Sequence, residues 1–116
     1  MTLMKIMIVD DNEGIREVMR TVVCDEHDIV KECSGGLDAV TMFERFRPDI
    51  VLMDIEMKDM DGFVAAAKIY VQDPAAKIIF VTNHNIPAFR AKAEQLHALG
   101  FVSKENLPEL GKLLHP

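Results

Sequence analysis

Residues 50–54 read Ile50-Val51-Leu52-Met53-Asp54, an unbroken apolar run that ends on a carboxylate. Apolar runs without alternation are typical of strands that are covered on both faces, as in a parallel sheet packed between helices. Residues 6–9 and 78–81 have the same character. Together with two more polar runs, these segments predict five strands, at residues 5–9, 28–32, 50–53, 77–81 and 101–103.

The segments between these runs have the apolar spacing of helices. The first has apolar residues at positions i, i+3, i+4, i+7 and i+8 from Ile15, which places them on one helix face. The same kind of spacing predicts further helices, so that the full set lies over residues 15–23, 39–46, 63–70 and 86–99, with a short helix from residue 107.

Strands that alternate with helices in this way predict an α/β fold. The usual arrangement of five such units has right-handed crossovers, and we expect a flavodoxin-like, doubly wound, five-stranded parallel sheet of order 2-1-3-4-5 with five helices. The 116 residues contain no repeat or linker, and their number fits one domain over residues 1–116.

Composition excludes several classes of function. A formal net charge of −6 argues against a nucleic-acid-binding surface, which requires a basic stripe. The apolar runs are too short to cross a membrane, and no secretory signal is present, so we expect a cytoplasmic protein. Cys24 and Cys33 form neither a metal-binding motif nor a disulfide framework, and we interpret them as free thiols.

Polar side chains follow four of the predicted strands. Asp10 and Asp11 follow the first strand, Asp54 the third, Thr82 the fourth and Lys104 the fifth. In an open parallel sheet, ligands bind outside the carboxyl ends of the strands. We therefore expect these three carboxylates, one hydroxyl and one ammonium group to face a single crevice.

This set of side chains indicates phosphoryl transfer with a divalent cation. Crowded carboxylates repel one another unless a cation lies between them, and hard oxygen ligands are those that Mg²⁺ prefers, with Mn²⁺ as a possible substitute. Phosphoryl transfer needs positioning and charge neutralisation more than acid or base catalysis. An aspartate carboxylate can itself be the nucleophile and form an aspartyl-phosphate.

Over essentially its whole length, the chain resembles the receiver domain of two-component response regulators. Five segments carry this resemblance, in the order and spacing of the family: Ile8-Val9-Asp10-Asp11-Asn12, Val51-Leu52-Met53-Asp54-Ile55-Glu56-Met57, Asp61-Gly62, Val81-Thr82 and Phe101-Val102-Ser103-Lys104.

The resemblance implies a phosphoacceptor and a metal site. Asp54 would accept a phosphoryl group from a histidine kinase or a histidine phosphotransfer protein. Asp11 and Asp54 would bind Mg²⁺ together with the backbone carbonyl of Glu56, and Asp10 would act directly or through water.

The resemblance also implies a switch. Lys104 would pair with the phosphoryl oxygens, Thr82 would hydrogen-bond one of them, and Phe101 would move inward when Thr82 shifts. The face formed by the last two helices and the fifth strand would then bind a downstream protein or effector domain, from a monomer or a phosphorylation-dependent dimer. The domain would catalyse only its own phosphorylation and dephosphorylation, so we do not expect an enzyme.

Three residues depart from the family pattern. Glu105 follows the lysine where the family usually has proline with a cis bond, Lys58 stands where proline is common, and the switch aromatic is Phe101 rather than tyrosine. A cis bond before a residue other than proline costs about 2.5–4 kcal/mol, so we predict a trans Lys104–Glu105 bond.

Three alternatives remain open from the sequence. The Asp-Asp-Asn run at residues 10–12 could simply cap the first helix. The chain could be a small Mg²⁺-dependent phosphohydrolase, because Asp54-x-Glu56 is faintly similar to the Asp-x-Asp of the haloacid dehalogenase type; turnover of small phosphomonoesters would distinguish it. It could also be a receiver-like binding module that takes no phosphate, although Asp11, Asp54, Thr82 and Lys104 are all present.

Overall fold

The computed structural model describes residues 3–115 and contains one five-stranded sheet. All adjacent strands are parallel, and their order is β2-β1-β3-β4-β5, which confirms the predicted topology. The strands lie within one residue of their predicted bounds: β1 (Lys5–Val9), β2 (Ile29–Cys33), β3 (Ile50–Met53), β4 (Ile78–Thr82) and β5 (Gly100–Ser103).

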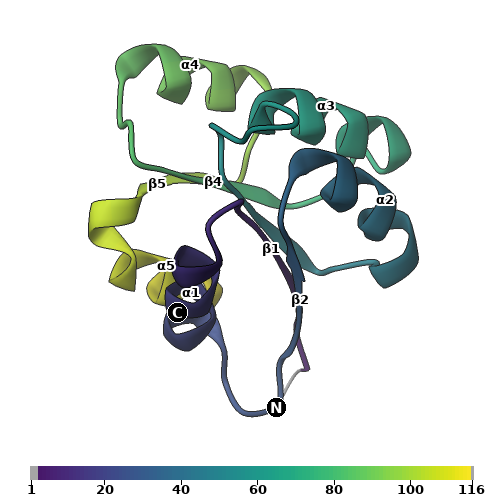
Figure 1. Ribbon diagram of the computed structural model, residues 1–116, viewed down its shortest axis with the longest axis vertical. Helices are drawn as coiled ribbons and strands as arrows, with labels where there is room; N and C mark the ends of the chain where they lie inside the picture. Colours follow the sequence, from purple (N-terminus) through teal and green to yellow (C-terminus); the bar gives the residue numbers. More distant parts are fainter. Residues whose placement is uncertain (1–2, 116) are drawn as a thin grey trace.

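Helices cover both faces of the sheet, as the unbroken apolar strands require. Figure 1 shows α2, α3 and α4 on one side and α1 and α5 on the other. Among the residues described, no helix is both long enough and apolar enough to span a bilayer. The helical elements are α1 (Glu13–Val23), α2 (Gly36–Phe46), α3 (Gly62–Gln72), α4 (Pro87–Gln95), a 3₁₀ turn η1 (Lys104–Asn106) and α5 (Pro108–Leu114).

Alternate residues of each central strand belong to two separate cores. In β1, Met7 and Val9 pack with α2, α3 and α4, whereas Ile6 and Ile8 pack with α1 and α5. All four side chains are fully buried. Since successive side chains point to opposite faces, a strand that is covered on both sides must be apolar at every position.

Helix α4 is shorter than predicted: it ends at Gln95 rather than near residue 99. His97 adopts the left-handed conformation, with φ of 59°, and the Ala98 N–H donates to the Ala93 carbonyl at 3.0 Å. This six-residue closure is a Schellman-type helix end. The next N–H, that of Leu99, donates to the Ile78 carbonyl at 2.8 Å, so the chain has already joined the sheet.

The register between β1 and β3 places their carboxyl ends at the same level. Val9 lies opposite Met53, and the Asp54 N–H donates to the Val9 carbonyl at 2.9 Å. The residues that immediately follow the two strands, Asp10 and Asp54, are therefore brought to the same edge of the sheet.

The start of α3 packs directly against the end of β3. Asp61 caps the helix by accepting the Phe63 N–H at 2.7 Å. The Gly62 N–H donates to the Ile55 carbonyl at 2.7 Å. A β-carbon at Gly62 would lie 2.0 Å from the backbone carbonyl oxygen of Asp54, so no larger residue fits without moving the chain.

We predict that Gly62→Ala lowers the free energy of unfolding by about 1–3 kcal/mol or more, because the added methyl group forces a backbone shift in a packed region. Gly100→Ala is the matched control, since a β-carbon there meets only ordinary contacts at 3.5–3.6 Å. Chemical denaturation of both variants measures the difference. Equal stability of the two variants would contradict the close approach at Gly62.

Candidate functional site

Six of the seven predicted site residues line one cavity of about 210 Å³ at the carboxyl edge of the sheet. The cavity lies at the end of the central strands, where the sheet topology led us to expect it. Those six residues are Asp10, Asp11, Asp54, Glu56, Thr82 and Lys104; the seventh, Phe101, does not line it.

Two buried carboxylates share one ammonium group at the base of this cavity. Lys104 Nζ lies 2.7 Å from Asp10 Oδ2 and 3.2 Å from Asp54 Oδ1, and the three side chains are 8%, 0% and 5% exposed. Asp54 Oδ1 also accepts the Ile55 N–H at 2.9 Å. A buried charge is tolerated when it is paired and hydrogen-bonded, and these contacts supply both conditions for Asp54.

Asn12, rather than either aspartate, caps α1. Its side chain accepts the Ile15 N–H at 3.0 Å, which leaves both carboxylates of the Asp10-Asp11 pair free of that role. Asp10 Oδ1 instead accepts the Asn12 N–H at 2.9 Å and so shapes the turn into the helix. The capping alternative therefore applies to Asn12 alone.

Asp11 lies at the edge of the cavity and contacts the loop that follows β3. Its Oδ2 accepts the Lys58 N–H at 3.2 Å. A proline at position 58, common in the family that the sequence resembles, has no N–H to donate. The departure from the family pattern at Lys58 thus adds a bond between the β3–α3 loop and Asp11.

The donor set fits a hard divalent cation. Asp10, Asp11 and Asp54 each offer a carboxylate oxygen within 4.8 Å of the others. Mg²⁺ is usually bound by one or two carboxylates and keeps several waters. Asp11 is partly exposed, so water can reach its carboxylate. The Glu56 carboxylate is exposed and pairs with His84 across the mouth of the cavity, so Glu56 faces the site from the solvent side.

Thr82 and Phe101 lie on the same face of the sheet but at different levels, because Phe101 pairs with Phe80, two residues before Thr82. Thr82 is buried at the cavity, and its Oγ1 accepts the His84 N–H at 3.0 Å. Phe101 is half-buried under α4, where the Arg90 guanidinium carbon lies 4.8 Å from its ring centroid. The coupling between Thr82 and Phe101 stays a prediction, and it would act along this one face of β4 and β5.

Burial and mutual repulsion set the protonation of the central groups. Burial, with a further contribution from the Asp10 carboxylate, raises the pKa of Asp54 from 3.8 to about 6, despite the opposing effect of Lys104. Burial lowers the pKa of Lys104, but the carboxylates of Asp10 and Asp54 outweigh it, so its pKa lies above the ordinary value. The ammonium group is therefore permanently charged near neutral pH.

Lys104 reaches both carboxylates although the peptide bond that follows it is trans. The described residues contain no cis peptide bond, so the Lys104–Glu105 bond is trans, as predicted. The chain instead turns at once into η1, where Ser103 Oγ accepts the Glu105 N–H at 3.2 Å.

The amino-acid sequence did not predict the role of the Asp59 carboxylate, which accepts two backbone N–H groups. Asp59 accepts the N–H groups of Gly36 and Leu37, both at 3.1 Å, and so joins the β3–α3 loop to the start of α2. The two donors lie 23 and 22 positions before Asp59 in the chain, and no local sequence pattern indicates a cap over such a separation.

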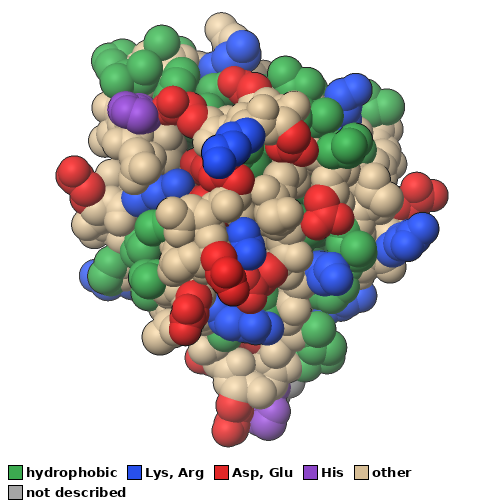
Figure 2. Space-filling view, in the orientation of Figure 1, with side chains coloured by type: hydrophobic (Ala, Val, Ile, Leu, Met, Phe, Trp, Pro, Cys, Tyr) green, Lys and Arg blue, Asp and Glu red, His purple; other side chains and the backbone are tan. Residues whose placement is uncertain are grey.

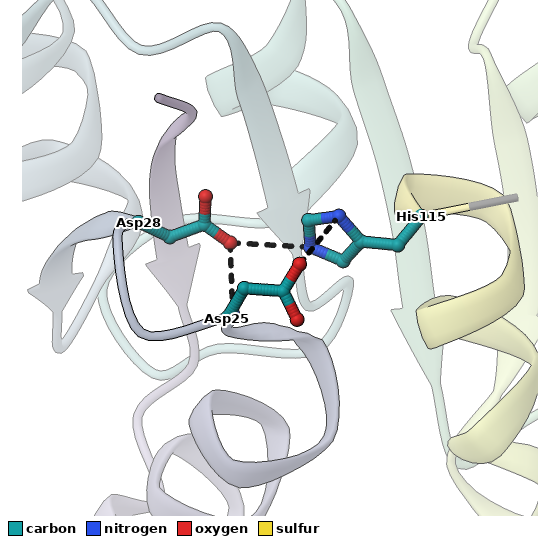
Figure 3. A group of neighbouring side chains, drawn as sticks. All are labelled: Asp25, Asp28 and His115. Atoms are coloured by element: carbon teal, nitrogen blue, oxygen red, sulfur yellow. Dashed lines mark hydrogen bonds and ion pairs between the residues drawn. The ribbon is translucent and has the colours of Figure 1, made fainter. Parts of the chain in front are cut away.

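A second cluster joins the end of α5 to the loop after α1, with Asp25, Asp28 and His115 pointing toward one another (Figure 3). His115 Nε2 lies 2.8 Å from the Val23 carbonyl oxygen and 3.1 Å from Asp28 Oδ2, while Nδ1 lies 3.3 Å from Asp25 Oδ2. A ring nitrogen that faces a carbonyl oxygen must carry a hydrogen and donate a hydrogen bond to it. The cluster is thus explained as a tertiary tie.

The surface has no continuous basic stripe on the face that Figure 2 shows. Lys and Arg side chains lie among acidic side chains there, including over the middle of the molecule. This distribution agrees with the formal net charge of −6.

Known proteins match this chain over nearly its whole length. The model of the response regulator receiver domain matches residues 6–115. The chemotaxis protein CheY of Listeria monocytogenes is 41% identical over 78 residues, which cover 66% of each protein. CheY of Halobacterium salinarum is 34% identical and covers 86% of this chain and 83% of that protein. The uncharacterized transcriptional regulatory protein YhcZ of Bacillus subtilis is 40% identical over 78% of this chain. The chain spans just under two thirds of the Listeria protein and 46% of YhcZ.

Solved structures have the same architecture. A LuxR-family response regulator from Aurantimonas has a TM-score of 0.87 and 32% identity, covering 96% of this chain and 81% of that one. The response regulator TrrA of Thermotoga maritima, solved in complex with Mg²⁺ and BeF, has a TM-score of 0.85 and 28% identity, and the match covers 97% of this chain and 96% of that one.

We predict that Asp54→Asn stabilises the metal-free protein at pH 8. A carboxyl whose pKa rises from 3.8 to about 6 on folding favours the folded state at low pH, and this contribution is lost as the pH rises between those values. The gain should be about 1–3 kcal/mol, since two pH units correspond to roughly 2.7 kcal/mol.

Denaturation in EDTA from pH 4 to pH 8 measures this difference. The two proteins should have similar stability near pH 4 and diverge toward pH 8. A difference that does not change with pH would show that Asp54 is not held in the disfavoured charged state.

Proposed function

This chain belongs to the response regulator receiver domain family, and we propose that it is a phosphorylation-dependent switch in which Asp54 accepts the phosphoryl group. Receiver domains act as signalling switches in two-component systems, and residues 6–115 carry the family match. One observation above all supports Asp54 as the acceptor: its carboxylate lies at the base of the strand-end cavity beside Asp10, Asp11 and Lys104.

In the proposed reaction, a carboxylate oxygen of Asp54 attacks the phosphorus of a partner phosphohistidine. The new O–P bond forms as the P–N bond breaks, and the histidine nitrogen leaves with the electron pair and takes up a proton. Mg²⁺ would supply charge neutralisation of the phosphoryl oxygens when bound. Asp10, Asp11, Asp54 and the carbonyl of Glu56 would hold it, and Mn²⁺ could take its place.

Lys104 and Thr82 would then bind the phosphoryl group. The Lys104 ammonium already lies 3.2 Å from Asp54 Oδ1. It could therefore form an ion pair with a phosphoryl oxygen on Asp54 without a large movement. Thr82 is 1% exposed and lines the same cavity, which supports a hydrogen bond from its hydroxyl to another phosphoryl oxygen. Each contact would differ between the unphosphorylated and the phosphorylated protein, and a switch requires such a difference.

The structural change on phosphorylation would pass from Thr82, at the end of β4, to the face formed by α4, β5 and α5. Phe101 in β5 packs beneath α4 and contacts Arg90, so a shift of Thr82 can alter that packing. A downstream protein or effector domain would bind this face, and a histidine kinase or histidine phosphotransfer protein would supply the phosphoryl group. The protein would act as one receiver domain, as a monomer or as a phosphorylation-dependent dimer.

We predict that Asp54→Asn abolishes phosphorylation while the fold is retained. Asparagine is close to isosteric with aspartate and keeps the oxygen that accepts the Ile55 N–H, but its amide is not a competent nucleophile. Incubation with acetyl phosphate and Mg²⁺, followed by intact-protein mass spectrometry, measures the change. The wild-type protein should gain one phosphoryl group, and a variant that gains the same mass would identify a different acceptor.

We predict that Asp11→Ala removes most of the Mg²⁺-dependent stabilisation. Binding only to the folded protein adds RT ln(1 + [L]/Kd), or about 1.4 kcal/mol at ten times Kd. In EDTA, the variant should melt at or above the wild-type temperature, because one of three neighbouring carboxylates is gone.

Thermal melts of both proteins in EDTA and in millimolar Mg²⁺ measure the two effects. A variant that melts well below the wild type in EDTA and keeps the full increase with Mg²⁺ would show that Asp11 is structural and that the metal binds elsewhere.

A further inference from the structure

The loop between β3 and α3 carries one proposed metal ligand but has no regular secondary structure. Residues 54–61 leave the sheet at Asp54 and enter the helix at Gly62, and the Glu56 carbonyl lies between these ends. A backbone carbonyl cannot bind a cation well unless its peptide is held in place. The contacts of this loop therefore decide whether the Glu56 carbonyl can bind a cation.

Its two ends are fixed by the core. Ile55 is fully buried, its N–H donates to Asp54 Oδ1 and its carbonyl accepts the Gly62 N–H. Met57 and Met60 pack partly against the core on the α2–α4 face of the sheet. These contacts set where the loop begins and ends, but they leave the exposed middle, at Lys58 and Asp59, to be positioned by polar contacts.

Two polar contacts from adjacent residues hold that middle section. The Lys58 N–H donates to Asp11 Oδ2 at 3.2 Å. The Asp59 carboxylate accepts the N–H groups of Gly36 and Leu37, one on each oxygen, at 3.1 Å. The loop is therefore tied on one side to a proposed metal ligand and on the other to the first turn of α2.

The chain at the start of α2 is shaped to receive Asp59. The residue before the helix, Gly35, offers no side chain to cap it, and a β-carbon there would lie 2.7 Å from both carboxylate oxygens of Asp59. A β-carbon at Gly36 would lie 2.9 Å from the β-carbon of Met60. Two consecutive glycines thus make room for the loop, and Asp59 supplies the cap that α2 lacks.

We propose that Asp59 is a positioning residue for the metal site: it holds the β3–α3 loop so that the Lys58 N–H meets Asp11 and the Glu56 carbonyl faces the carboxylates. This rests on the proposed function, in which Asp11 and Glu56 are metal ligands. The Asp59 carboxylate does not line the phosphorylation cavity, so it acts through the loop and not by binding the cation itself. The main rival role is that of a helix cap only, which would affect stability but not metal affinity.

The first experiment compares Asp59→Ala with Asp73→Ala. Asp73 also accepts a backbone N–H in an exposed turn, that of Ala75 at 2.9 Å, so its loss removes one charge and one contact far from the cavity. The chain contains no tryptophan, so Mg²⁺ binding to the metal-free proteins is followed by calorimetric titration at fixed pH and salt. Loss of outer-shell partners typically weakens metal binding about 10–100-fold, and we expect about tenfold for Asp59→Ala and no change for Asp73→Ala.

The second variant, Gly35→Ala, keeps every charge. Its β-carbon would displace the Asp59 carboxylate from the helix start, and the backbone at this position is extended, with φ of −171°, so alanine itself is tolerated there. It should weaken Mg²⁺ binding in the same direction as Asp59→Ala. An effect of Asp59→Ala that Gly35→Ala does not reproduce would be a charge effect and would overturn the proposal.

Amide hydrogen exchange in EDTA gives a readout that does not depend on the metal. The Lys58 amide should exchange faster in Asp59→Ala and Gly35→Ala than in the wild type or Asp73→Ala. If Asp59→Ala is less stable but keeps the wild-type Mg²⁺ affinity, Asp59 is a cap only, and the assignment of Asp54 as phosphoacceptor still stands. A wild-type protein that binds no Mg²⁺ would overturn both the positioning role and the metal site on which it rests.

Discussion

The hydrogen bond from the Asp54 N–H to the Val9 carbonyl, at 2.9 Å, continues the ladder between β1 and β3 past the last residue of both strands. Because the strands are parallel and end at the same level, the residues that follow them emerge side by side. Asp10 and Asp54 are these residues, and both are buried. Lys104 and Asp11 lie close to these two adjacent buried carboxylates.

Lys104 supplies the positive charge that pairs with both carboxylates. It directly follows β5, the edge strand that pairs only with β4, and its ammonium group contacts both Asp10 and Asp54. One ammonium cannot neutralise three carboxylates, and the raised pKa of Asp54 reflects the burial and repulsion that remain. A site that stores such repulsion responds strongly to a cation or to a phosphoryl group, because each changes the charge at one point.

Close packing of the chain around the site depends on two glycines. Gly62 lets α3 begin against the Asp54 carbonyl, and Gly35 lets the Asp59 carboxylate approach α2. Both positions therefore allow close packing of the β3–α3 loop. The family's usual proline is replaced by Lys58, whose N–H bonds Asp11, so this chain holds the loop by hydrogen bonds where a proline ring would restrict it.

The amino-acid sequence determined the fold class, the sheet order and five of the residues at the cavity, whereas Glu56 was implied only by the family resemblance. These follow from local features: unbroken apolar runs identify strands that are buried on both faces, and a parallel topology sends all their carboxyl ends to one edge. The sequence also supported a trans bond after Lys104, because the intrinsic cost of a cis bond is local. Only the tertiary structure decided where α4 ends and that Asp59 and His115 form long-range ties. Those outcomes depend on partners more than 20 residues away or on a left-handed residue that is not glycine, and neither leaves a periodic signal in the chain.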